Sequence, residues 1–356
     1  MISRISLSGF RGIKNRAFNL TKKSAIIGMN GSGKTHILEA IHLVSGGQLH
    51  YFQAPREEHY NLELSIDSLI GPRTYNLIRN DGREEFRIQG GKVTSIKYKE
   101  DLPYRTVFLS PFDMNLLYFA PAIRRDYLDS ILSRAYAQFP KIKREYEAAM
   151  RQRNALLKKI RDHEVDKKNL DYWDRVFAEK AQNYHQYRKS LITFIEQNSK
   201  VFLEFLPKYK HRFSYISKFN ERDDIQEFTL AYLHENRDRD IITGHTHIGP
   251  HLDDFILEIQ YQGDTQSFLD ATLVLSRGET KVLLLALKQI EILFLKKIFQ
   301  SPIVLLFDDI FAELDQNYAE HVIETFDVDQ VVFTTQRVLP VSEKWEEFSC
   351  INLELQ

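Results

Sequence analysis

The sequence predicts an α/β fold in which both ends of the chain form one domain and a mostly helical lobe is inserted between them. A Gly-rich pattern lies at 28–35, and an apolar run ending in two aspartates lies at 303–309. Because these patterns are the two halves of one kind of site, the chain ends are expected to meet. We expect the first domain to comprise 1–120 and 244–356, and the lobe to comprise 121–243.

The first pattern is a phosphate-binding loop, because it follows an apolar segment and precedes a stretch with helical periodicity. Glycines let backbone amides turn toward phosphates, Lys34 brings a positive charge beside the β- and γ-phosphates, and Thr35 can ligate Mg²⁺. A chance Gly-rich turn would not have these flanks. The pattern predicts binding of ATP and Mg²⁺ by Gly28, Asn30, Gly31, Ser32, Gly33, Lys34 and Thr35.

The rest of the predicted domain is rich in strands. Before the lobe, short apolar runs alternate with turn signals. After the lobe, a pair of continuous apolar runs is typical of buried parallel strands. The expected strands are 2–7, 62–66, 74–78, 85–88, 105–109, 255–261, 303–307 and 330–335, with a helix at 278–299.

The second pattern places carboxylates at the end of a buried strand. Asp308 is expected to hold Mg²⁺, and Asp309 to orient the attacking water. With Lys34, these two aspartates are the predicted catalytic residues, and Thr35 and Asp308 the predicted metal ligands. Asp315, in the following Ala-Glu-Leu-Asp segment, is expected to reach nucleotide across a dimer interface. Alternatively, Asp315 is only an acidic residue near a helix N-terminus.

A third motif precedes the long apolar helix. Ser276 and Gly278 lie at the predicted helix N-terminus, where backbone amides can bind an anion. This segment resembles the signature motif of ABC-type ATPases, which acts on nucleotide held by a second protomer, so an ATP-sandwich homodimer is implied. The same residues, with Glu279, also fit an ordinary capping box.

The middle of the chain is basic and predicts a helical hairpin. Between residues 121 and 189 there are 17 lysines and arginines against 10 aspartates and glutamates, although the net charge of the whole chain is −1. Apolar residues recur at helical spacing on both sides of a polar break at 162–168. The surplus favours contact with nucleic acid as much as an ordinary solvated helix face.

Composition predicts a globular, cytoplasmic protein. Hydrophobic residues make up 43% of the chain, and its one cysteine, Cys350, excludes an internal disulfide framework. No apolar run approaches the length of a membrane span, and the N-terminal residues lack the apolar core of a secretion signal.

The combination of motifs resembles the RecF recombination-repair ATPases along nearly the whole chain. The resemblance rests on Ile5 to Arg11, Asn30 to Thr35, Val107 to Asp113, Gly249 to Asp254, and Leu305 to Asp315, in that order. It implies an ABC-type P-loop ATPase head that binds gapped or junction DNA as an ATP-dependent dimer and works with RecR and RecO partners.

Three departures accompany the resemblance. Leu252 stands where the family usually has arginine within its Gly-Pro-His motif, which puts a charge contact there in doubt. Thr334-Thr335-Gln336 stands where transporter ATPases have a switch histidine, and Asp309 replaces the more common glutamate. The missing histidine and the shorter Asp309 both indicate slow hydrolysis.

Three alternatives remain open on the sequence. An ABC-type subunit of a non-DNA assembly, such as a defence system, would share every nucleotide motif. A small-molecule P-loop kinase would leave the signature helix unused. A metal site is the third alternative, and its candidate ligands are His245, His247, His251, Asp253 and Asp254.

Overall fold

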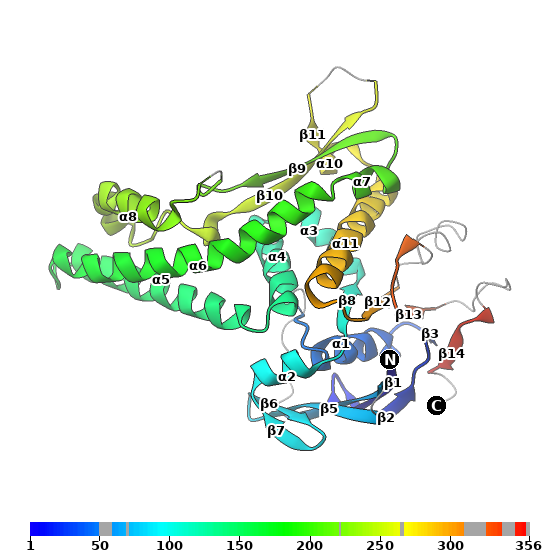
Figure 1. Ribbon diagram of the computed structural model, residues 1–356. Coiled ribbons are helices and arrows are strands. Elements are labelled where there is room, and N and C mark those ends of the chain that lie inside the picture. Colours follow the sequence, from blue (N-terminus) through cyan, green and yellow to red (C-terminus); the bar gives the residue numbers. More distant parts are fainter. Residues whose placement is uncertain are drawn as a thin grey trace. The chain divides into compact units, whose positions relative to one another are not determined.

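Both ends of the chain meet in one compact unit. The computed structural model describes residues 1–49, 59–68, 71–220, 222–263, 267–309, 325–336 and 346–353 (Figure 1). Unit 1 comprises Met1–Leu116 with Leu275–Gln356, and unit 2 comprises Leu117–Val274. The predicted α/β head assembled from both chain ends is therefore confirmed. Within the described ranges, no helix is both long and apolar enough to cross a membrane.

A parallel sheet in unit 1 carries the nucleotide motifs. Every residue of β12 is buried, as expected of a central parallel strand. β13 lies between β3 and β12, so the strand before the Gly-rich loop and the strand before Asp308 are both its neighbours. The strands in spatial order are β14 (Ser349–Asn352), β3 (Lys23–Ile27), β13 (Gln330–Thr335), β12 (Ile303–Phe307) and β8 (Arg105–Leu109).

An antiparallel sheet forms the other layer of unit 1. Helix α1 (Lys34–Val44) packs Ile37 and Ile41 into a core shared with both sheets. The helices α2 (Ser95–Asp101) and α11 (Arg277–Phe299) complete the unit. The sheet runs in the order β2 (Ile13–Asn19), β1 (Ile2–Phe10), β4 (Tyr60–Ser68), β5 (Gly71–Asn80), β6 (Arg83–Ile88) and β7 (Gly91–Val93).

Unit 2 is mostly helical. Its three-stranded sheet has the order β11 (Leu269–Asp270), β10 (Asp254–Tyr261), β9 (Tyr209–Ile216). Its helices are α4 (Pro121–Ala135), α5 (Phe139–Arg161), α6 (Leu170–Gln197), α7 (Lys200–Phe205), α8 (Ile225–Glu235), α9 (Arg237–Thr243) and α10 (Ala271–Val274). The short α3 (Asn115–Tyr118) spans the division between the units.

The predicted hairpin corresponds to α5 and α6, which have 23 and 28 residues. They pack through aromatic and aliphatic side chains at helical spacing. Tyr146 of α5 contacts both Phe177 and Tyr184 of α6, with ring centroids 5.4 and 5.0 Å apart.

The compact units differ from the predicted domains mainly at one boundary. Residues 244–274 were assigned to the head from their strand signal, but in the structure they belong to unit 2. The reason is strand pairing, because β10 pairs along its whole length with β9, from Asp254↔Ile216 to Tyr261↔Tyr209. The sequence reasoning did not include β9 as a strand.

Candidate nucleotide site

The phosphate-binding loop connects β3 to α1, as its sequence predicts. Gly33 precedes the helix with φ of 94°, a left-handed conformation that favours glycine. At Gly28, a Cβ atom would lie 2.7 Å from the Ser32 hydroxyl. These two positions explain why the loop needs glycine: one requires an unusual backbone angle, and the other a close approach.

Lys34 and Ser32 give the loop its polar character. Lys34 is 7% exposed, and its ammonium donates to the carbonyl oxygens of Gly28 at 2.7 Å and Met29 at 2.9 Å. Ser32 Oγ is buried and makes no hydrogen bond within the described structure. A positive charge and a buried hydroxyl beside a helix N-terminus fit a phosphate chain.

Thr35 and Thr334 both hold Asp308. Thr35 Oγ1 donates to Asp308 Oδ2 at 2.8 Å, and Thr334 Oγ1 donates to Asp308 Oδ1 at 2.7 Å. Burial raises the pKa of Asp308 above its ordinary value. The hydroxyl and carboxylate oxygens therefore form a compact, anionic oxygen donor set of the kind that Mg²⁺ prefers.

Asp309 is positioned by β13 and the residue after it. Its backbone amide donates to Thr334 Oγ1 at 2.9 Å, and its Oδ2 accepts from Gln336 Nε2 at 3.1 Å. Sequence reasoning noted Thr334 and Gln336 only as replacements for a switch histidine. Their contacts with the two aspartates depend on strand order, which no local pattern revealed.

A buried glutamate, Glu39, lies on α1 one turn after Thr35. Glu39 is 0% exposed and forms an ion pair with Arg11, whose Nε is 3.2 Å from Glu39 Oε2. Burial raises the pKa of Glu39 to about 7; the Arg11 charge opposes this shift and the Asp308 charge adds to it. Arg11 has φ of 50°, an uncommon conformation for a non-glycine residue that places it in the turn between β1 and β2.

A hollow of about 440 Å³ adjoins the loop. One wall is the loop and the start of α1, and the other is the turn between β1 and β2. The polar and glycine residues that line it are Arg11, Gly12, Lys14, Asn15, Arg16, Gly31, Ser32, Gly33 and His36. Its volume and its position beside the loop suit the nucleoside end of a nucleotide whose phosphates lie on the loop.

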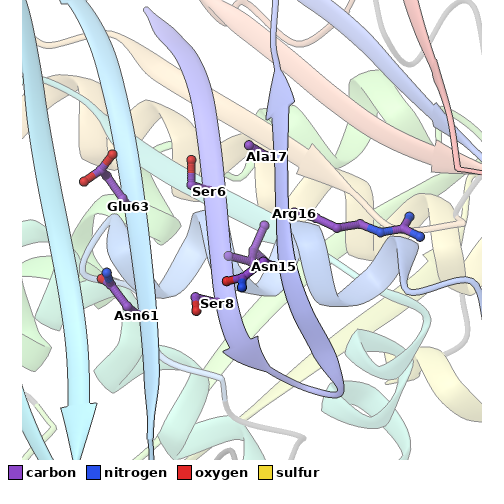
Figure 2. A pocket seen from close by; sticks show the side chains of 8 residues that line it. Ser6, Ser8, Asn15, Arg16, Ala17, Asn61 and Glu63 are labelled. Atoms are coloured by element: carbon purple, nitrogen blue, oxygen red, sulfur yellow. The ribbon is translucent and has the colours of Figure 1, made fainter. Parts of the chain in front are cut away.

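A second hollow, of about 360 Å³, lies on the outer face of the antiparallel sheet (Figure 2). Ser6 and Ser8 of β1 lie between β2 and β4, and their small side chains leave the space open. Glu63 of β4 lines the hollow and accepts a hydrogen bond from Asn76 at 2.8 Å. A carboxylate and the lack of a phosphate-binding loop make this hollow a poor match for a nucleotide.

The proposed signature residues lie at the start of α11. Ser276 is the N-cap and forms a reciprocal capping box with Glu279. Both Ser276 and Gly278 are exposed, and a Cβ on Gly278 would meet nothing within 4 Å. The capping box thus coexists with an open helix N-terminus. Asp315 lies outside the described residues.

A buried lysine ties α11 to the parallel sheet. Lys288 Nζ lies 3.2 Å from Asp113 Oδ1 and 3.3 Å from Glu291 Oε2, and donates to the Phe108 carbonyl at 3.1 Å. Asp113 also accepts from the Ser110 amide at 2.6 Å, directly after β8. The β8 end is joined to the aspartate pair, because the Asp308 amide donates to the Leu109 carbonyl at 2.8 Å.

Four of the five candidate metal ligands, His247, His251, Asp253 and Asp254, are engaged in hydrogen bonds or ion pairs, whereas His245 is exposed. His251 Nε2 donates to the Thr246 carbonyl at 3.2 Å, so Nδ1 is the acceptor for the Tyr146 hydroxyl at 2.5 Å. Burial lowers the pKa of His251 to about 4. Asp254 is paired with Arg124 at 2.6 Å. In the described part of the chain, no group of three or more His, Cys, Asp or Glu residues could hold a metal ion.

Comparison with known proteins agrees with this geometry. The model of the AAA ATPase domain matches residues 1–267. The chain belongs to the AAA ATPase domain family. This AAA ATPase is 26% identical to the DNA replication and repair protein RecF of Clostridium perfringens, over 100% of this chain and 99% of that protein. It is 28% identical to the protein of the same name from Shewanella baltica, over 94% of this chain and 91% of that protein.

The fold of this AAA ATPase is also that of solved RecF structures. The recombination mediator protein RecF-ATPrS of the RecFOR pathway superposes with a TM-score of 0.84 at 23% identity, over 99% of this chain and 95% of that one. The RecF-ATP structure of the same pathway gives a TM-score of 0.81 at 24% identity, over 96% of this chain and 93% of that one. The chain is thus similar to RecF proteins in sequence and fold along nearly its whole length, and the resemblance noted in its motifs is confirmed.

Proposed function

We propose that this chain is an ATP-dependent DNA-binding protein of recombinational repair and replication. ATP would close two copies into a sandwich dimer on gapped or junction DNA, and slow hydrolysis would reopen it. One observation carries this proposal: unit 1 brings Lys34 and Thr35 of the phosphate-binding loop together with Asp308, and presents an open helix N-terminus at Ser276. The full-length similarity to RecF supplies the DNA-repair context.

Within one protomer, the loop Gly28, Asn30, Gly31, Ser32, Gly33 and Lys34 would bind the phosphates. Thr35 and Asp308 would hold Mg²⁺, which supplies charge neutralisation at the β- and γ-phosphates. Asp309 would orient the attacking water, with its own carboxylate held by Gln336.

The second protomer would complete the site through Ser276 and Gly278. A 23-residue helix presents unsatisfied amides and partial positive charge at its N-terminus, where a γ-phosphate can bind. Ser276 hydrogen-bonds within its own helix, to Glu279, and Ser276 and Gly278 both remain exposed. Asp315 is proposed to reach the same nucleotide.

Slow hydrolysis is proposed from the chemistry around the water. Asp309 is one methylene shorter than the glutamate usual at this position, and one of its oxygens already accepts from Gln336. A base that holds water less closely lowers the rate of the chemical step. A long-lived closed state suits a protein that marks a DNA structure.

Partners are proposed from the relatives. The similar RecF structure is named as a protein of the RecFOR pathway. RecR-like and RecO-like proteins in the cytoplasm are therefore the expected partners. DNA is the expected ligand because relatives are named DNA replication and repair proteins. The competing proposal is an ATPase subunit of a non-DNA assembly, which would use the same nucleotide residues.

The test is fluorescence anisotropy of a gapped duplex titrated with protein, without nucleotide, with ATP and Mg²⁺, and with Lys34→Ala in ATP and Mg²⁺. We expect ATP to tighten DNA binding and to shift the protein from monomer to dimer by sedimentation, and the variant to lose both effects. Absence of DNA binding in every nucleotide state would reject this function in favour of a non-DNA assembly.

A further inference from the structure

The solvent face of α5 is cationic along its whole length. Among the residues of α5, nine are exposed and none of the nine is acidic. Six are cations and three are small or neutral: Lys141, Arg144, Ala148, Arg151, Gln152, Ala155, Lys158, Lys159 and Arg161. We call this set the α5 stripe.

The spacing of the stripe aligns its charges. Arg144, Arg151 and Lys158 follow one another at intervals of seven residues, which is two helical turns or about 10.5 Å. Ala148 and Ala155 lie on the same face between them. The face from Lys141 to Lys159 is about 27 Å long, and its alanines permit another surface to approach the helix closely.

The charges of the stripe are mostly available to a partner. Arg144, Lys158 and Lys159 form no ion pair within the described residues. Arg161 is paired with Asp162 at 3.2 Å, and Lys141 and Arg151 reach Glu145 and Glu147 only at 3.8 Å. Exposed pairs of this length contribute little, so a stronger anion would replace them.

Two other cations of the basic segment are engaged inside unit 2. Arg153 is fully buried and paired with Asp174 at 2.7 Å and Asp240 at 2.8 Å. Arg188 is fully buried and paired with Asp129 at 2.6 Å. The surplus of positive charge in the sequence therefore overstates the charged surface of the lobe and concentrates what remains on α5.

Helix α6 provides a contrast within the same hairpin. Its exposed residues mix the cations Arg175 and Lys189 with the carboxylates Asp171, Glu179 and Glu196. Lys189 is also paired with Asp223 at 2.8 Å. The fully exposed residues of α5 thus carry only positive charge, with Glu145 and Glu147 half-buried beside them, whereas the exposed residues of α6 carry both signs.

We propose that the α5 stripe binds the phosphate backbone of double-stranded DNA. A length of about 27 Å matches roughly eight base pairs at about 3.4 Å each, and aligned Lys and Arg residues bind phosphates without reading sequence. The stripe has no exposed aromatic or long aliphatic residue, which a membrane-surface helix requires. This inference rests on the proposed function, because it locates a DNA contact of that protein.

The test compares two triple variants of the full-length protein. The stripe variant is Arg144→Gln, Arg151→Gln and Lys158→Gln, and the control is Lys168→Gln, Arg175→Gln and Lys189→Gln. Both remove three exposed positive charges from the hairpin region. Binding to a duplex of about 30 base pairs is measured by anisotropy with ATP and Mg²⁺ over a range of salt concentrations.

We expect the stripe variant to reduce the slope of log K against log salt by about 2 to 3, since each phosphate contact contributes about 0.9. The control is expected to keep the wild-type slope within about 1. Binding of a fluorescent ATP analogue and the circular dichroism spectrum should not change in either variant, because the substituted side chains are exposed.

Other outcomes separate the two proposals. Equal slopes for the stripe variant and the wild-type protein would overturn the stripe while leaving DNA binding intact. Equal losses in stripe and control variants would also overturn it, since binding would then follow net charge alone. A wild-type protein that binds vesicles with about 30% phosphatidylserine but no DNA would overturn the proposed function and the stripe together.

Discussion

Thr35, in the first turn of α1, donates a hydrogen bond to Asp308 at the end of β12, across 273 residues of chain. This contact joins the two ends of the sequence at the predicted magnesium site. Asp308 lies among other acids: the Asp309 charge raises the pKa of Asp308, and the Asp308 charge in turn raises the pKa of Glu39. The site therefore concentrates negative charge that a divalent cation would neutralise.

Asp308→Asn is expected to remove most of the hydrolytic activity. Replacing a metal-binding carboxylate by an amide should lower Mg²⁺-dependent kcat by about 100-fold or more, while ATP affinity measured without Mg²⁺ changes little. Phosphate release under single-turnover conditions measures the rate of hydrolysis. Titration of a fluorescent ATP analogue measures ATP affinity. Asp327→Asn is the control, because its side chain is 88% exposed and pairs only with Lys296 on the surface. Unchanged kcat in Asp308→Asn would show that another residue holds the metal.

Glu39 should make unit 1 less stable as pH rises. Its ordinary pKa is 4.5 and burial raises the folded value to about 7, so between these values the folded state binds more protons than the unfolded state. The free energy of unfolding should then fall with increasing pH across this window, by about 3 kcal/mol at most. Glu39→Gln should flatten this region of the curve, measured by urea denaturation without Mg²⁺.

The control for this pH dependence is Glu179→Gln, which changes an exposed glutamate in unit 2. It should leave the slope between pH 5 and about pH 7 as in the wild-type protein. A wild-type slope of opposite sign would contradict the raised pKa of Glu39.

Lys288→Met should destabilise unit 1 strongly. It would leave two buried carboxylates, Asp113 and Glu291, without the ammonium that lies between them. Removing one partner of a buried ion pair costs about 3 to 5 kcal/mol. On the same helix, Lys296→Met removes a surface pair with Asp327 and should cost less than about 1 kcal/mol. Similar urea midpoints for the two variants would show that the Lys288 pairs contribute little.

Local patterns predicted the loop and the long helix, but not the contacts between distant segments. The loop depends on glycines and on the adjacent Lys34, and α11 depends on its own apolar periodicity, so both could be predicted. Thr334 could not be assigned to Asp308, because that contact requires β13 to lie beside β12. Strand order is a property of the whole sheet.

The basic segment at 121–189 shows that surface charge, too, depends on contacts between distant residues. Its surplus was counted correctly, yet Arg124 pairs with Asp254, which is 130 residues away, and Arg153 pairs with Asp240. These acids lie outside the segment, so a count along the sequence could not show which cations remain at the surface. The histidines at 247 and 251 likewise bind Asp240, Tyr146 and Thr246 through folding.

Gly249→Ala should destabilise unit 2, whereas Gly278→Ala should leave unit 1 stable and impair the proposed dimer. Gly249 has φ of +128°, and a Cβ there would lie 2.5 Å from the Tyr146 hydroxyl and 3.0 Å from His251 Nδ1. A strained backbone angle and a displaced buried hydrogen bond together should cost about 2 to 4 kcal/mol, measured as a lower thermal midpoint.

Gly278 is the matched glycine, because its Cβ would meet nothing within 4 Å and helical residues are tolerated there. Its alanine variant should keep the wild-type midpoint or gain slightly, since alanine favours a helix by up to about 1 kcal/mol. In sedimentation with ATP, however, a methyl group at the open helix N-terminus should weaken dimerisation if phosphate approaches the amides closely. Normal ATP-dependent dimers in Gly278→Ala, and in the bulkier Gly278→Gln, would argue that the N-terminus of α11 does not contact the partner's nucleotide.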